Sequence, residues 1–138
     1  MATFDAMTAL QAAALWSGLS ILLLVVLSFR TIFTRKRLGV SFGDGGNAEL
    51  TAASRAFGNA AEYIPPCLVM LVLMALLDFQ PIWIHAVGGA MLLGRILHAW
   101  GLSQTKQPSF GRMSGMILTQ LALIGGAGAL VACAFGCI

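Results

Sequence analysis

Charged residues are scarce in this sequence of 138 residues. Lysine, arginine, aspartate and glutamate together make up 9% of the chain, whereas hydrophobic residues make up 59%. An ordinary soluble domain has about 25% charged residues, so this composition excludes a soluble globular protein with a polar surface. The net charge is +3, but the basic residues flank apolar segments instead of forming a polar face, which argues against nucleic acid as a partner. The expected environment is a membrane.

Cysteine is also rare, and its positions exclude a disulfide framework. Cys67, Cys133 and Cys137 all fall within apolar segments, where cysteine usually acts as a small packing residue. We therefore assign no disulfide and no metal site to them.

Four apolar segments are long enough to cross a bilayer, which takes about 20 helical residues. The first and last carry no charge, whereas the second contains Glu62 and the third contains Arg95. The residues before Ala6 include Asp5 but no base, so we expect the first segment to be a retained helix and not a signal peptide. We predict an all-α membrane protein, a four-helix transmembrane bundle forming one domain over residues 1–138. The helices are expected at roughly residues 5–33, 48–77, 81–104 and 111–136.

The basic residues cluster on one side of the membrane. With four spans, both termini lie on one side and the first and third connections lie on the other. The bases near those two connections are Arg30, Arg35, Lys36, Arg37, Arg55, Arg95, Lys106 and Arg112. Asp5 and Asp78 fall on the opposite side. The positive-inside rule places the basic side in the cytoplasm, so we expect a plasma (inner) membrane protein with both termini outside.

A column of polar residues begins the second segment. Arg55, Asn59 and Glu62 fall within an arc of roughly 60° on a helix. An ionisable group within a bilayer costs about 2.5 to 3.5 kcal/mol, so it normally faces protein or water and has a function. The structural alternative is an internal ion pair between Arg55 and Glu62. Pro65 and Pro66 follow the column and predict a kink there, because each removes a helix hydrogen bond.

Further polar residues lie in the third and fourth segments. Arg95 and His98 are three residues apart and share a helix face. Arg112 stands at the expected start of the fourth helix, where unpaired N–H groups favour an anion. Taken alone, His98 is more often a buried hydrogen-bonding residue, and Arg112 can instead extend to lipid headgroups. Together they indicate an anion site at the basic end.

Small residues predict close helix contact in a membrane. They are dense in the third segment at Gly88 and Gly89 and in the fourth at Gly125, Gly126 and Gly128. A bundle of this size has few helices with which to shield its polar groups from lipid. We therefore expect an oligomer.

Three motifs in this order resemble the MAPEG family, the membrane-associated proteins in eicosanoid and glutathione metabolism. They are Arg55-x-x-x-Asn59-x-x-Glu62-Tyr63-x-Pro65, then Gly94-Arg95-Ile96-Leu97-His98-Ala99, and then Arg112. The resemblance covers essentially the whole chain. It implies a homotrimer with three glutathione sites between neighbouring subunits, near the cytoplasmic face.

The resemblance also implies a role for each residue of the site. Arg55 and Arg95 would hold carboxylates of glutathione, and Glu62 would hold its ammonium group. Asn59 and Tyr63 would contact other polar groups, and Arg30 and His98 complete the expected binding set. Arg112 matches the catalytic arginine that holds the thiolate, since a nearby cation lowers the pKa of a thiol.

One position departs from the family pattern and keeps a second function open. Many family enzymes carry a tyrosine seven residues after the third-helix arginine, where this chain has Leu102. The leading hypothesis is a glutathione-dependent transferase or peroxidase that attacks lipophilic electrophiles arriving from the bilayer. The alternative is a non-catalytic membrane scaffold that binds glutathione or lipid. A proton-coupled exporter using Glu62 is disfavoured, because Arg55 on the same face would repel cations.

Overall fold

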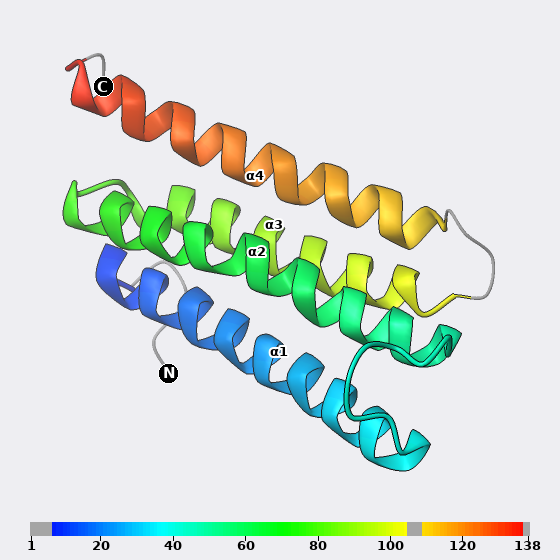
Figure 1. The fold of residues 1–138 in the computed structure, drawn as a ribbon. Coiled ribbons are helices and arrows are strands. Elements are labelled where there is room, and N and C mark those ends of the chain that lie inside the picture. The colour runs from blue at the N-terminus through cyan, green and yellow to red at the C-terminus, as the bar shows by residue number, and fades with distance from the viewer. Residues whose placement is uncertain (1–6, 105–108, 137–138) are drawn as a thin grey trace.

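The computed structural model describes residues 7–104 and 109–136, which form four helices (Figure 1). These are α1 (Ala9–Leu38), α2 (Ala48–Leu76), α3 (Pro81–Leu102) and α4 (Phe110–Ala134). Each helix is long and apolar enough to cross a membrane. The described chain is thus an all-helical protein with four candidate membrane spans.

The bounds of α1 follow from its two caps. Thr8 and Gln11 form a capping box at the start, and Gly39 ends the helix in the left-handed conformation with φ 68°. The helix therefore ends later than the expected residue 33, and three basic residues occupy its last turn. Cations are favourable there because they face the negative end of the helix dipole. Residues 5 and 6 of the expected helix lie outside the described residues.

The loop between α1 and α2 is ordered by local hydrogen bonds. Asp44 accepts from the Gly46 amide over 3.0 Å and from the Thr51 hydroxyl over 2.8 Å. Asn47 caps α2 by accepting from two backbone N–H groups. These bonds fix where the second helix starts and hence the height of its polar column in the bundle.

The four helices run antiparallel to their neighbours in sequence (Figure 1). The α1–α2 loop, the C-terminal end of α3 and the N-terminal end of α4 lie at one end of the bundle, and the α2–α3 turn lies at the other. Arg37, Arg55 and Arg112 are therefore at the same end, whereas Asp78 is in the α2–α3 turn. This is the arrangement that the distribution of charges predicted. Asp5 and Lys106, which entered that prediction, lie outside the described residues.

Large apolar side chains cover much of the outer surface. Leu22 on α1, Val69 on α2 and Ile124 on α4 are each more than 60% exposed. Such a surface suits hydrocarbon and not water.

Helix α2 continues through Pro65 and Pro66 without interruption.

The closest helix contacts occur between α3 and α4, and glycines make them. A Cβ added to Gly94 would lie 2.9 Å from the Gly115 carbonyl oxygen, and one added to Gly115 would lie 2.5 Å from the His98 amide nitrogen. Gly88 and Gly126 were expected at contacts, and Trp16 and Met70 respectively fill the space beside them. A Cβ added to Gly125 or Gly128 would meet no atom of another helix within 4 Å, so neither glycine makes a close helix contact within the described chain.

Candidate functional site

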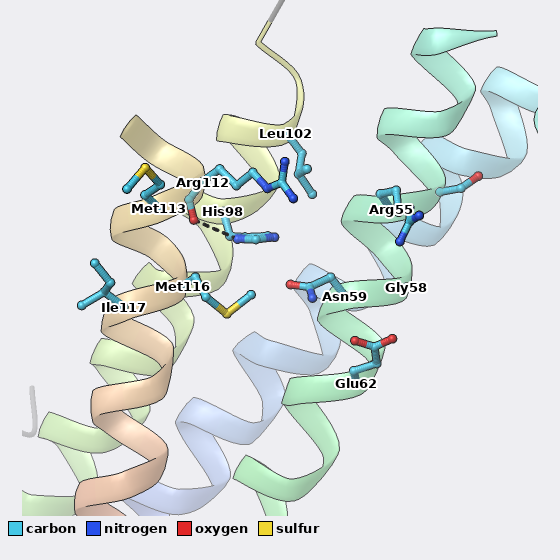
Figure 2. Close-up of a pocket in the computed structure, with 11 residues that line it drawn as sticks. Arg55, Gly58, Asn59, Glu62, His98, Leu102, Arg112, Met113, Met116 and Ile117 are labelled. Carbon is cyan, nitrogen blue, oxygen red and sulfur yellow. Dashed lines mark hydrogen bonds between the residues drawn. The ribbon is translucent and has the colours of Figure 1, made fainter. Parts of the chain in front are cut away.

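A cleft of about 690 Å³ opens between α2 and α4 near the basic end of the bundle, with α3 contributing to its wall (Figure 2). This volume is in the usual range for small-molecule sites. The residues that line it are Ser54, Arg55, Gly58, Asn59, Glu62, His98, Leu102, Arg112, Met113, Met116 and Ile117. Five of the eight residues proposed from sequence therefore meet at one cavity.

Helix α2 supplies the polar wall of the cleft. Arg55, Asn59 and Glu62 lie one above another along it, as their spacing predicts (Figure 2). Within the described residues, the only ion pair joins Arg37 and Glu49. The alternative of an internal Arg55–Glu62 pair therefore has no support in this structure, and both charges are available to a ligand.

Arg95 lies behind this wall and not in it. Its side chain is 2% exposed and donates to Asn59 Oδ1 over 2.6 Å. It also donates to the Thr119 hydroxyl, over 3.0 Å from Nε and 2.7 Å from a terminal nitrogen. A buried guanidinium needs such partners because an unpaired buried charge is costly. In this chain Arg95 is placed to orient Asn59.

Tyr63 is partly buried, contacts Arg95 and does not line the cleft. Its ring lies 4.9 Å from the Arg95 guanidinium carbon, and its hydroxyl accepts from Gln120 over 3.3 Å. Thr119 and Gln120 on α4 were not predicted from sequence, since neither residue type is unusual in a helix. Arg30 lies on α1 and is also outside the cleft of a single chain.

The register of Arg112 is fixed by the α3–α4 contact. Ser109 caps α4, and its hydroxyl donates to the Gly101 carbonyl over 2.7 Å. The Arg112 carbonyl oxygen lies 3.1 Å from His98 Nδ1. These two contacts hold the first turn of α4 against the last turns of α3, so Arg112 and His98 reach the cleft together (Figure 2).

The wall opposite the polar column is apolar. Met113, Met116 and Ile117 follow one side of α4, and Leu102 on α3 also lines the cleft (Figure 2). Their three- and four-residue spacing could have predicted this wall from sequence. The cleft thus joins a charged side to an apolar side.

The charged residues that line the cleft are two arginines and one glutamate. Arg55 and Arg112 suit anionic groups, and Glu62 suits a cationic group. The Ser54 hydroxyl is buried beside them and has no hydrogen-bond partner in the described chain. Buried polar groups are normally hydrogen-bonded, so Ser54 is a further candidate contact for a bound polar molecule.

A second cleft of about 780 Å³ lies near the opposite end, and it is mainly apolar. Asp78 is the one charged residue among those lining it. His85 Nδ1 accepts a hydrogen bond from Trp16 Nε1 over 2.9 Å, and His85 lines neither described cleft. The polar cleft at the basic end is therefore the candidate functional site.

Comparison with known proteins identifies relatives across most of the chain. The model of the MAPEG family matches residues 13–132, a range that includes every residue lining the polar cleft. Two relatives are each called inner membrane protein YecN, from Escherichia coli K12 and Escherichia coli O6:H1. Each is 38% identical over 112 residues, covering 81% of this chain and 84% of the relative. No solved structure matches the chain significantly.

Proposed function

This chain belongs to the MAPEG family, and we propose on that premise that its polar cleft binds glutathione as a thiolate that attacks lipophilic electrophiles. The reaction class is that of a glutathione transferase or peroxidase. The name of the YecN relatives and the four candidate spans support placement in the inner membrane, and the charge distribution supports a site near the cytoplasmic face.

One observation carries the proposal: Arg55, Glu62 and Arg112 line the same cleft and form no ion pair with one another. Glutathione has two carboxylates, one ammonium group and a thiol. Binding it therefore requires several cations and at least one anion near each other. The cleft supplies these charges, and the amide of Asn59 and the hydroxyl of Ser54 add neutral hydrogen-bonding groups.

Each residue then has a proposed task. Arg55 holds a carboxylate and Glu62 holds the ammonium group, because these pairs have opposite charge. Asn59 contacts the peptide, while Arg95 and Tyr63 act through the orientation of Asn59.

Arg30 and the oligomeric state form a separate part of the proposal. Arg30 is outside the cleft of one chain, so its expected contact with glutathione needs a second subunit. We propose the homotrimer for that reason.

Arg112 stabilises the thiolate, which is the nucleophilic form of glutathione. Lowering a thiol pKa from about 8.5 to about 6.5 requires roughly 2.7 kcal/mol of selective stabilisation of the anion. Arg112 is exposed in the single chain, so an interaction of that size requires the neighbouring subunit of the proposed trimer to exclude bulk water from the cleft. The apolar wall formed by Met113, Met116 and Ile117 would receive a lipophilic electrophile from the bilayer.

The test is a titration of glutathione into the purified protein in detergent, followed by the ultraviolet absorbance of the thiolate at neutral pH. The native protein is expected to give a saturable signal, and Arg112→Ala is expected to lose it. Lys36→Ala serves as the matched variant, because it also removes one positive charge at the basic end but from an exposed side chain outside the cleft. It should keep the signal. No thiolate signal in the native protein would contradict the proposal.

A non-catalytic scaffold is the second candidate, and Leu102 is the observation that favours it. Leu102 lines the cleft and offers no hydroxyl to a bound glutathione. The two functions differ in one measurement. A scaffold would bind glutathione or a lipid without consuming an electrophile, whereas the transferase would consume glutathione and an electrophile in equal amounts.

A further inference from the structure

The His98 ring has one nitrogen occupied by protein and one directed to the cleft. Nδ1 lies 3.1 Å from the Arg112 carbonyl oxygen. Figure 2 shows the ring extending from α3 into the cleft. Nδ1 faces the Arg112 carbonyl on α4, and Nε2 points away from α4. Nε2 has no hydrogen-bond partner within the described residues.

The contact with Arg112 determines where the ring carries hydrogen. A carbonyl oxygen can only accept, so Nδ1 must be the donor in this bond. A neutral imidazole has one N–H group, and its second nitrogen then presents a lone pair. In the neutral ring that lone pair is on Nε2, at the cleft.

Helix packing holds the ring in this position. Gly115 lets α4 approach so closely that an added Cβ would lie 2.5 Å from the His98 amide nitrogen. His98 is 5% exposed, and Arg112, whose carbonyl orients the ring, also lines the cleft. The contact between α3 and α4 therefore positions two groups at the cleft. The Arg112 guanidinium would stabilise an anion, and the His98 ring would accept a proton.

We propose that His98 is a catalytic base that accepts the thiol proton of glutathione at Nε2. This inference rests on the proposed function, because it assigns a step within the same cleft. The S–H bond breaks, its electron pair stays on sulfur, and the proton forms the Nε2–H bond. The products are a thiolate beside Arg112 and an imidazolium that keeps its Nδ1–H bond to the Arg112 carbonyl. The imidazolium then releases its proton to water.

The experiment separates proton transfer from binding. Glutathione is mixed rapidly with native protein and with His98→Asn, and the rate of thiolate formation is followed by absorbance. The asparagine amide can still donate to the Arg112 carbonyl but cannot accept a proton. We expect the rate to fall by about 10²-fold or more, the size typical of general base catalysis. Affinity for S-methylglutathione, which has no thiol proton, should change by less than about threefold, roughly 0.65 kcal/mol.

A second variant tests the base directly. His98→Ala is expected to form thiolate slowly and to become faster as imidazole is added, since free imidazole can enter the vacated space and accept the proton. A purely structural role would give no such dependence. This variant also decides the case in which His98→Asn loses affinity for S-methylglutathione: rescue by imidazole supports the proposal, and absence of rescue overturns it.

Failure of this inference is distinguishable from failure of the proposed function. If native protein does not bind S-methylglutathione, the glutathione site itself is wrong and His98 has no such role. If native protein binds it but His98→Asn forms thiolate at the native rate, the site stands and the role of His98 is overturned.

Discussion

The guanidinium of Arg95 donates to the amide oxygen of Asn59 over 2.6 Å, and this bond connects the buried interior of the bundle to the wall of the cleft. Asn59 lines the cleft and Arg95 does not. The amide is thus fixed with its oxygen toward Arg95, which leaves its N–H groups for other partners. Arg95, which the sequence places in the binding set, thus contacts Asn59 and does not line the cleft itself.

Loss of either Asn59 or Arg95 should destabilise the protein, because the hydrogen bond between the Arg95 guanidinium and the Asn59 amide is broken. We expect Asn59→Ala and Arg95→Met to share a coupling free energy of about 1 to 3 kcal/mol. The measurement is a double-mutant cycle of unfolding free energies in detergent. Strictly additive effects of the two changes would show that the bond contributes nothing.

The glycine contact between α3 and α4 predicts a sharp difference between two substitutions on one helix. Gly115→Ala should cost about 1 to 3 kcal/mol, because its Cβ would meet the Gly94 carbonyl and the His98 backbone. Gly128→Ala is the matched control, since nothing lies within 4 Å of its added Cβ. Unfolding free energies of the two variants test this. Equal stabilities would contradict the packing described for α3 and α4.

Leu102 provides a test in which function should improve. Leu102→Tyr is expected to raise affinity for glutathione about 5- to 10-fold, which corresponds to a hydrogen bond of about 1 to 1.4 kcal/mol. Leu102→Phe has the same ring without the hydroxyl and should give little of this gain. Calorimetric titration of both variants provides the comparison. A gain that is equal in the two would indicate ring packing and not a hydrogen bond.

The loop between α1 and α2 predicts a pH dependence. Hydrogen bonds from the Gly46 amide and the Thr51 hydroxyl lower the pKa of Asp44 below its usual value. A carboxyl group whose pKa is lower in the folded state stabilises that state above the unfolded pKa and loses this effect as pH falls through the folded pKa. Asp44→Ala should therefore melt at a lower temperature than native protein at pH 7.

The same comparison at low pH provides the control. At a pH below the folded pKa of Asp44, the carboxylate is protonated in both states and its pH-dependent contribution is gone. The difference in melting temperature should then shrink. A difference that is unchanged, or that grows as the pH falls, would show that the charge of Asp44 does not stabilise this loop.

The candidate site was only partly predictable from sequence. The column of Arg55, Asn59 and Glu62 follows from helical periodicity alone, and these residues share one wall. Periodicity placed Arg95 and His98 on one face but could not separate their environments. The Thr119 hydroxyl on α4 accepts hydrogen bonds from Arg95 on α3. That contact depends on how α3 and α4 cross.

The sequence by itself determined that this is a four-span helical membrane protein with its bases at one end. Hydrophobic length and charge position are sums over residues, and a bilayer responds to them without reference to tertiary contacts. Only the tertiary structure decided which nitrogen of His98 donates to the Arg112 carbonyl and which arginines reach the cleft. Those outcomes depend on the close approach of α3 to α4 at Gly115 and on the burial of Arg95. The periodicity of a single helix does not determine its distance from another helix.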